Sequence, residues 1–252
     1  MRFGICAGPA MALAAAKAGF CYLEAGLAAI SAAAPAEFDH MAETVASAGI
    51  AVEALNLMLP GAFRLTGPDA CLSDIPEYLE SGFARAARLG VRLQVFGSGG
   101  ARRRPADWPL EKALGQLADF LRLAAPIAAR HDIAIAIEPL HPGECNVINT
   151  VSHAIALARQ VSMANVGVLA DWYHMALQNE GVEGVLAAGP LLLHCHIANP
   201  DGRRFPLPGD GADFSPFFHA LRQIGYDGRV SVEGTGAPEE YAQTRIRLEN
   251  CL

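Results

Sequence analysis

Four ionisable residues stand at the ends of apolar stretches of strand length in the second half of the chain. Glu138 follows Ile-Ala-Ile-Ala-Ile, Asp171 follows Val-Gly-Val-Leu-Ala, His196 ends Leu-Leu-Leu-His-Cys-His, and Glu233 follows Arg-Val-Ser-Val. A charge buried at such a position costs free energy unless a partner neutralises it. Three carboxylates and an imidazole are suitable ligands for Mn²⁺, Mg²⁺, Co²⁺ or Zn²⁺. We therefore predict that these four side chains hold one divalent metal ion, and that the neighbouring His194 is a core histidine.

Two carboxylates beside a metal ion suggest proton transfer next to a carbonyl group. A divalent cation that bridges the carbonyl and adjacent hydroxyl oxygens of a ketose stabilises the enediolate that forms when the C–H proton leaves. Glu138 and Glu233 come from predicted strands with two others between them, so they could flank a bound sugar as base and acid. We predict that these two are the catalytic residues, and that they exchange a proton across one carbon.

Other polar residues lie in the loops next to the predicted metal ligands. Glu144, His174, Arg203 and Arg204 follow three of the predicted strands, and Glu24 ends an earlier one. Because they lie beside the predicted metal ligands, we expect Glu24, Glu144, His174 and Arg203 to contact a molecule bound there. His174 and Arg203 would polarise its carbonyl oxygen. The order Arg203-Arg204 leaves open which of the two arginines contacts the substrate.

A glycine followed by an apolar run marks the join between a helix and a strand at four places, Gly19, Gly49, Gly90 and Gly225. Glycine readily adopts the left-handed conformation that commonly ends a helix. The apolar runs of the whole chain predict eight strands, at residues 2–6, 20–25, 51–57, 91–97, 133–138, 166–171, 191–197 and 229–233.

Helices are predicted between these strands. The clearest run from 73 to 90, from 109 to 124 and from 213 to 225, where caps or an apolar stripe with helical spacing occur. Apolar strands joined by helices indicate a parallel sheet that is covered on both sides. Eight such units of about 31 residues fill the 252 residues. We predict an α/β fold, a single (β/α)8 TIM barrel over residues 1–252, with its chemistry at the carboxyl ends of the strands.

Composition narrows the classes of partner. The net charge of -7 opposes binding to a phosphate backbone. The 52% of hydrophobic residues, without an unbroken apolar run of about 18, indicate a globular chain and not a disordered or membrane-spanning one. Six cysteines without a Cys-x-x-Cys pair are interpreted as reduced core thiols of a cytoplasmic protein. We expect a small carbohydrate as partner, no nucleic acid, no membrane, and either a monomer or a homo-oligomer.

The motifs around the predicted ligands resemble the xylose-isomerase-like barrel superfamily. They are Glu138-Pro-Leu-His-Pro-Gly-Glu144, Asp171-Trp-Tyr-His174, His194-Cys-His196-Ile-Ala-Asn and Val-Glu233-Gly. Within that superfamily they look like the sugar phosphate isomerase/epimerase group, which includes D-tagatose and D-psicose 3-epimerases and hydroxypyruvate isomerase. The resemblance implies a divalent-metal-dependent sugar isomerase or epimerase with the same four metal ligands. It also implies that Glu144, His174 and an arginine after the seventh strand hold the substrate, an arginine that in the epimerases follows the ligand histidine by six residues. Here Gly202 stands at that spacing and Arg203 comes next.

Three other interpretations stay open at this point. A metal-dependent lyase, such as an inosose or 3-dehydroshikimate dehydratase, shares the proton abstraction next to a carbonyl. An endonuclease-type hydrolase of the same superfamily shares the fold, although it needs more metal ions and more histidine ligands than this chain offers at its second and third strands. A sugar-binding barrel without catalysis is the third, and the acid/base pair argues against it.

Overall fold

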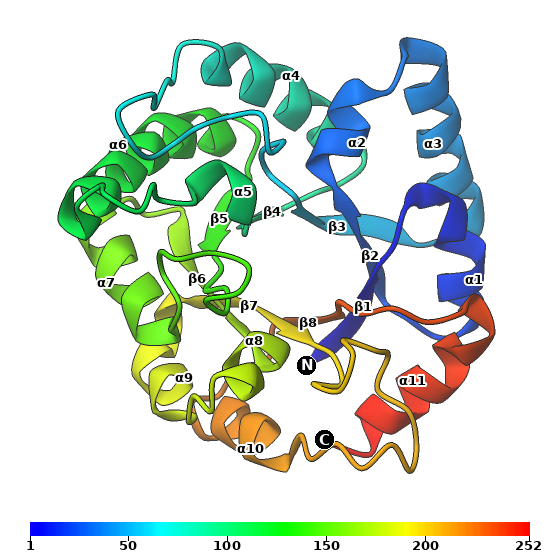
Figure 1. Cartoon of the computed structure of the whole chain (residues 1–252). Coiled ribbons are helices and arrows are strands. Elements are labelled where there is room, and N and C mark those ends of the chain that lie inside the picture. The colour runs from blue at the N-terminus through cyan, green and yellow to red at the C-terminus, as the bar shows by residue number, and fades with distance from the viewer.

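Eight parallel strands close into a barrel in the computed structural model, which describes all 252 residues (Figure 1). Each strand pairs with the next along the chain, and β8 pairs with β1 to complete the ring. Helices surround the ring. In this view the N-terminus lies close to the ring near β1 and β8, and the C-terminus lies between α10 and α11. The predicted TIM barrel is confirmed.

The strands and helices alternate along the chain. The strands are β1 (Arg2–Cys6), β2 (Tyr22–Gly26), β3 (Ala51–Asn56), β4 (Leu93–Phe96), β5 (Ala134–Ile137), β6 (Val166–Asp171), β7 (Leu192–Ile197) and β8 (Arg229–Val232). The helices are α1 (Ala12–Lys17), α2 (Leu27–Ala32), α3 (Pro35–Ala48), α4 (Ile75–Arg88), α5 (Gly99–Arg102), α6 (Leu110–Ala129), α7 (Val151–Val161), α8 (Trp172–Leu177), α9 (Glu183–Ala188), α10 (Ser215–Gln223) and α11 (Tyr241–Glu249). Short 3-10 turns are η1 (Pro9–Met11), η2 (Gly189–Leu191) and η3 (Pro238–Glu240).

The eight strands predicted from the apolar runs are all present, with ends displaced by no more than two residues. The three clearest predicted helices correspond to α4, α6 and α10. The four glycines that were expected to end helices all have positive φ, for example 90° at Gly90. Local sequence therefore specifies the alternation of elements, and closure of the ring follows from their number.

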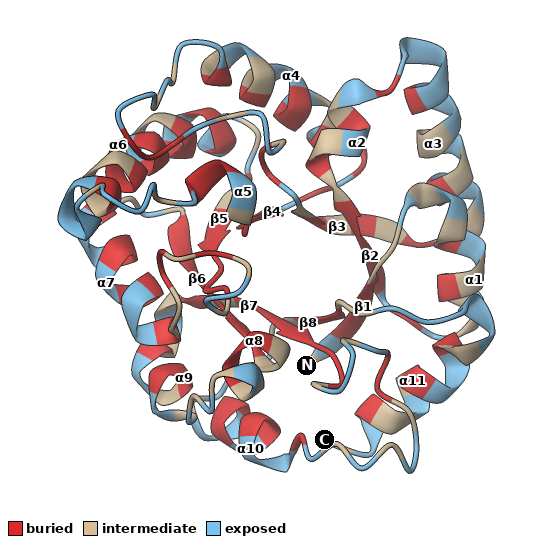
Figure 2. Cartoon of the chain, in the orientation of Figure 1, coloured by how far each residue is buried: buried red, intermediate tan, exposed pale blue.

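Most of the core lies between the barrel and the surrounding helices, where 66 buried hydrophobic residues form one continuous cluster (Figure 2). A smaller apolar cluster fills part of the barrel interior, with Tyr22, Ala54, Leu93, Val95, Ala136 and Leu169. Side chains alternate between these two environments along each strand. In β7, for example, Cys195 contributes to the outer core, whereas its neighbours His194 and His196 are buried polar residues.

The cysteines differ in part from expectation. All six are free thiols, but only Cys145 and Cys195 are buried. Cys21 and Cys71 are exposed because they lie in turns before β2 and α4, outside the packed elements. The description of all six as core thiols was therefore wrong. No helix has both the length and the apolar character needed to cross a membrane.

A glycine in β1 makes room for the aromatic ring inside the barrel. Gly4 pairs with Tyr22 and with Ser231, and a Cβ atom added to it would lie 2.2 Å from the Tyr22 ring. We expect Gly4→Ala to lower the free energy of unfolding by about 1–3 kcal/mol, measured by urea denaturation, because the ring has no free space to occupy. Gly8→Ala is the matched control, since nothing lies within 4 Å of its added carbon. Equal stability of the two variants would contradict this explanation.

Candidate metal and substrate site

The four predicted metal ligands come together at the carboxyl ends of β5 to β8. Glu138 and Glu233 directly follow β5 and β8, Asp171 ends β6, and His196 lies in β7. One potential ligand atom from each lies within 4.8 Å of all the others. Nδ1 of His196 faces all three carboxylates, at 3.1 Å from Glu138 Oε1, 3.3 Å from Glu233 Oε2 and 3.8 Å from Asp171 Oδ2.

This group of donors fits a divalent cation on physical grounds. Glu138, Asp171 and His196 are buried, and Asp171 Oδ2 has no hydrogen-bond partner. A buried carboxylate oxygen without a partner is costly, and a cation at the centre of the group would remove that cost. Three carboxylate oxygens and one imidazole nitrogen are a donor set suited to Mn²⁺, Mg²⁺ or Zn²⁺.

The charges of the group perturb one another. Burial raises the pKa of Asp171 to about 6, and the charge of Glu233 adds to that rise. Burial and Glu233 also raise the pKa of Glu138. Burial alone would raise the pKa of Glu233, but His196 and Arg203 lower it to about 2. The four predicted ligands therefore form one electrostatic unit, in which Glu233 is the carboxylate that pairs directly with Arg203.

Asp171 has a second role that fixes its orientation. It is the N-cap of α8, and its Oδ1 accepts hydrogen bonds from the backbone N–H of Tyr173, at 2.7 Å, and of His174, at 3.4 Å. Capping uses one carboxylate oxygen and leaves Oδ2 to face the other ligands. The position of Asp171 between strand β6 and helix α8 therefore fixes the orientation of its carboxylate.

His174 presents a free donor to the same site. Its Nδ1 accepts the backbone N–H of His141 at 3.2 Å, so the ring proton lies on Nε2. Nε2 is buried without a hydrogen-bond partner, 3.7 Å from Asp171 Oδ2 and 3.9 Å from Glu144 Oε2. Burial lowers the pKa of His174 to about 4, so the ring is neutral near pH 7. It can donate one hydrogen bond to an oxygen atom of a bound molecule.

Arg203, and not Arg204, reaches the site. Nη1 of Arg203 lies 3.0 Å from Glu144 Oε1, its Nη2 pairs with Glu233 Oε2, and its guanidinium stacks over Tyr173 at 4.7 Å. Arg204 turns outward and pairs with Asp201. The backbone causes this division, because Arg203 adopts φ of 51° directly after a glycine with φ of 75°.

Glu24 is placed differently from expectation. It was predicted to bind the substrate, but it is fully buried at the level of the metal ligands. Its Oε1 lies 2.9 Å from His196 Nε2 and its Oε2 lies 2.7 Å from His194 Nε2. Both oxygens are therefore occupied by histidines, on the side of the His196 ring away from the carboxylates, and no surface remains for a substrate.

The xylose isomerase-like TIM barrel family model matches residues 12–251 of this chain. The chain belongs to that family. This match confirms the resemblance seen in the motifs.

Several curated relatives in the family are sugar epimerases. The chain is 33% identical to the 3-dehydro-D-guloside 4-epimerase of Escherichia coli over 50% of this chain and 48% of that protein. It is 34% identical to the L-ribulose 3-epimerase of Methylomonas, over 48% and 40%, and 29% identical to the D-psicose 3-epimerase of Agrobacterium fabrum, over 60% and 54%. The aligned part of the chain thus spans about half the length of these relatives.

Solved structures share the whole fold. The D-allulose 3-epimerase of Methylomonas in complex with D-allulose has a TM-score of 0.87 at 22% identity, covering 100% of this chain and 97% of that one. A family 2 AP endonuclease from Brucella melitensis has a TM-score of 0.75 at 19% identity, covering 95% of each chain. Because epimerase and endonuclease share this barrel, the fold does not choose between their reactions.

Two neighbours of the site were not singled out from the sequence. Asn56, at the end of β3, donates from Nδ2 to Glu233 Oε1 at 3.3 Å. Arg102 is wholly buried, stacks over Phe96 and donates to the backbone oxygens of Phe96 and Glu138. An Asn at a strand end was a usable signal for the first. Nothing in Arg102-Arg103-Arg104 indicates that one arginine lies beneath the Glu138 backbone.

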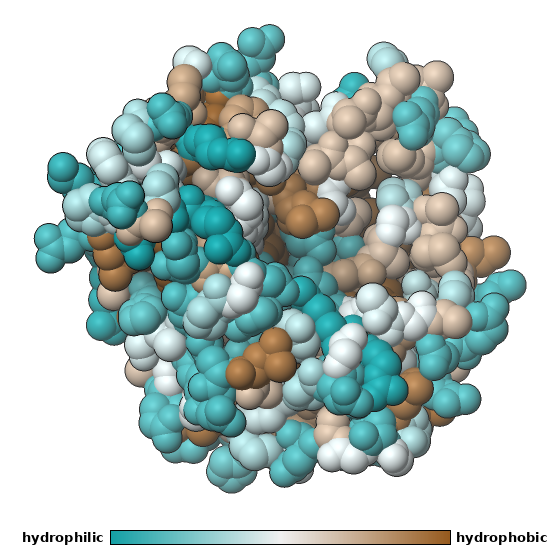
Figure 3. All heavy atoms as spheres, viewed as in Figure 1, coloured by the Kyte–Doolittle hydropathy of each residue, from teal (hydrophilic) through white to brown (hydrophobic).

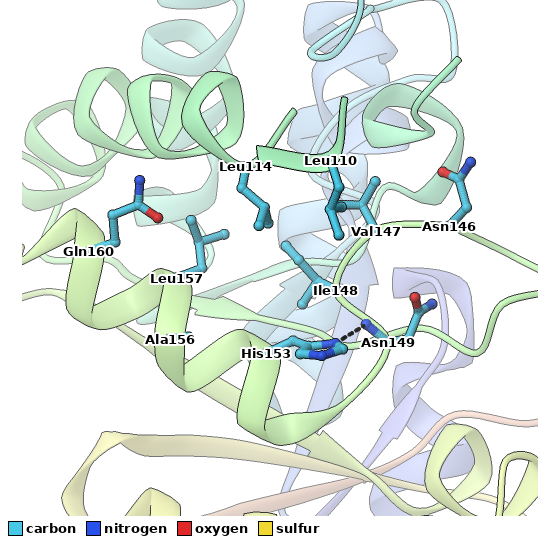
Figure 4. A pocket seen from close by; sticks show the side chains of 10 residues that line it. All are labelled: Leu110, Leu114, Asn146, Val147, Ile148, Asn149, His153, Ala156, Leu157 and Gln160. Atoms are coloured by element: carbon cyan, nitrogen blue, oxygen red, sulfur yellow. Dashed lines mark hydrogen bonds between the residues drawn. The ribbon is translucent and has the colours of Figure 1, made fainter. Parts of the chain in front are cut away.

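A separate groove lies on the outside of the barrel between α6 and α7 (Figure 4). Leu110 and Leu114 of α6 face Leu157 of α7 across it, and Ile148 forms part of its floor. None of the predicted site residues lines this groove. Figure 3 shows a hollow near the centre of this face, bordered by hydrophilic side chains below and by apolar ones above.

Replacing Asp171 by Asn separates metal binding from folding. The amide oxygen can still cap α8, but the negative charge facing the other ligands is lost. We expect Mn²⁺ binding, measured by isothermal titration calorimetry, to weaken by more than about 100-fold. The midpoint of thermal unfolding of the metal-free protein should stay equal or rise, because one of several buried like charges is removed.

Asp213→Asn is the matched control for this variant. Asp213 accepts the backbone N–H of Ser215 at the start of α10, far from the predicted ligands. Its replacement should leave the Mn²⁺ affinity unchanged. If Asp171→Asn bound Mn²⁺ as tightly as the control, Asp171 would not be a ligand.

Proposed function

We propose that this protein is a divalent-metal-dependent sugar isomerase or epimerase that removes a proton from the carbon next to a carbonyl group. The observation that carries the proposal is the placement of Glu138 and Glu233 next to one imidazole nitrogen, at 3.1 and 3.3 Å from Nδ1 of His196 and beside the third carboxylate. The epimerase relatives support it, since they act on ketoses or keto-sugars. The substrate would be a ketose, a ketose phosphate or a hydroxy-keto acid.

Glu138, Asp171, His196 and Glu233 would hold the metal. When bound, a divalent cation supplies Lewis acid stabilisation of negative charge on the carbonyl and adjacent hydroxyl oxygens. Glu233 is ionised at neutral pH because Arg203 and His196 lower its pKa, so it serves as the first base. Glu138, which faces the same Nδ1 atom of His196, would serve as the opposing acid. Removal from one face of the carbon and return from the other inverts its configuration.

Residues next to this pair would orient the substrate. The Nε2 proton of neutral His174 can donate to the developing oxyanion, and the Arg203 guanidinium adds a fixed positive charge nearby. Glu144, partly exposed and paired with Arg203, is placed to accept a hydrogen bond from a sugar hydroxyl. Arg203 thus connects substrate binding to the ionisation of Glu233.

We prefer sugar chemistry to nucleic-acid cleavage. The chain has a second group of close donors in His141, Glu144 and His174, but Glu144 is already paired with Arg203. We therefore propose one metal ion per chain, one domain over residues 1–252, and a small carbohydrate as the partner. Metal analysis of the purified protein tests this point, since two or three ions per chain would favour a hydrolase.

Solvent exchange tests the acid/base assignment. In D₂O with Mn²⁺, the wild-type protein should incorporate deuterium at the carbon next to the carbonyl of its ketose substrate, as followed by ¹H NMR over a panel of ketoses and ketose phosphates. Glu138→Gln and Glu233→Gln should each abolish this exchange, because neither can accept the proton. Retained exchange in both variants would refute the assignment. Exchange accompanied by loss of water would identify a dehydratase.

The adjacent arginines provide a matched pair of substitutions. We expect Arg203→Lys to lower kcat/KM by about 10- to 100-fold, because lysine cannot keep the two-sided contact with Glu144 and Glu233. Arg204→Lys should change kcat/KM by less than about twofold, since its only partner is an exposed aspartate. Steady-state kinetics with the ketose identified by the exchange experiment measures both values of kcat/KM. Similar losses in both variants would contradict the assignment of Arg203.

A further inference from the structure

A chain of buried polar side chains leads from the barrel interior to the candidate metal site. Tyr22 Oη lies 3.0 Å from Ser231 Oγ, and Ser231 Oγ lies 3.2 Å from His194 Nε2. His194 Nε2 lies 2.7 Å from one oxygen of Glu24, whose other oxygen lies 2.9 Å from His196 Nε2. All five residues are 0% exposed. Since no solvent reaches these five side chains, their hydrogen bonds must be made within the protein.

Glu24 determines where the His196 proton lies. An ionised carboxylate only accepts hydrogen bonds, so the Nε2 atom that faces it must carry the proton. The other nitrogen, Nδ1, faces the three carboxylates of the site, so it is the atom that can give up its proton and bind a cation through its lone pair. The reverse arrangement would place a proton on Nδ1, where it would occupy the position of a cation.

Glu24 is itself held in one orientation. Its second oxygen is fixed by His194, which Ser231 and Tyr22 anchor in turn. Cys6 of β1, its neighbour in the strand register, has its sulfur within 4.8 Å of both Glu24 and His196. Rotation of the carboxylate would break two buried hydrogen bonds at once. The His196 ring is consequently fixed from behind.

We propose that Glu24 is a positioning residue that fixes the tautomer and the ring orientation of His196, and so raises the affinity of the site for a divalent cation. This inference rests on the proposed metal site, but not on the identity of the sugar. A carboxylate behind a ligand histidine also increases the basicity of the ring, which strengthens the bond from Nδ1 to a metal. His194 would support Glu24 without contacting metal or substrate.

Two substitutions separate the charge of Glu24 from its hydrogen bonds. In Glu24→Gln the amide can keep its oxygen toward His196 and turn its NH₂ toward His194. His194 can then move its proton to Nδ1, which has no partner now. This variant removes the charge and preserves the tautomer. In Glu24→Leu both contacts are lost, so the orientation of the His196 ring is lost as well.

The experiment compares Zn²⁺ affinity in the full-length protein without substrate. Isothermal titration calorimetry should give a Kd about 10-fold weaker for Glu24→Gln and about 100-fold weaker for Glu24→Leu than for the wild type. Long-range ¹H–¹⁵N NMR of the Zn²⁺-loaded wild type should show the His196 proton on Nε2, as it should in Glu24→Gln. Glu53→Gln is the control, because Glu53 pairs with Arg2 and Arg229 away from the ligands. Its Zn²⁺ affinity should equal that of the wild type.

The outcomes distinguish this inference from the proposed function. Circular dichroism of the metal-free variants establishes whether they are folded. If Glu24→Leu does not fold, the Zn²⁺ affinity of Glu24→Gln alone tests the inference. Kd values within threefold of the wild type, or a proton on Nδ1 in the loaded wild type, would overturn the role of Glu24. A wild type that binds no divalent cation would overturn both this inference and the metal site. Normal Zn²⁺ binding without turnover of any ketose would overturn only the proposed reaction.

Discussion

Four carboxyl groups crowded at one end of a barrel, three of them buried, are the constraint on which the rest of this site depends. Glu24, Glu138, Asp171 and Glu233 lie around a single imidazole, and burial of so many carboxylates is unfavourable unless positive charge is supplied. The protein supplies part of it through Arg203 and through the His196 ring. We propose that the remaining imbalance of charge would give the site its affinity for a cation. Every nearby element either contributes to this cluster of charges or excludes water from it.

The barrel satisfies this constraint with short-range devices. A parallel ring brings the carboxyl ends of all strands to one rim, so residues distant in sequence meet without long connections. Asp171 both caps a helix and faces the cluster, while Gly97 leaves the space that Glu138 occupies, since an added Cβ would lie 2.1 Å from Glu138 Oε2. Such double use of small features lets each short connection hold a functional group firmly.

The sequence sufficed for the barrel and for which four residues meet, because both follow from counting strands and noting what ends them. The role of Glu24 could not be found in this way. The β2–β3 register shifts between Leu23 and Glu24, and the two histidines that occupy Glu24 come from a strand 170 residues away in the chain. The choice between Arg203 and Arg204 depended on a left-handed backbone after Gly202, which residue types alone do not specify. Contacts between strands distant in the chain, and the local backbone conformation of loops, are thus the features that the residue order alone does not determine.

The site divides unevenly between the two halves of the barrel. All four candidate ligands belong to β5 to β8, whereas β2 and β3 contribute only Glu24 and Asn56, which hold ligands in place. The loops of the first half contribute none of the four candidate ligands. Such a division favours evolutionary change, because much of the loops after β1 to β3 can vary to suit a new sugar while the candidate ligands in the second half stay in place.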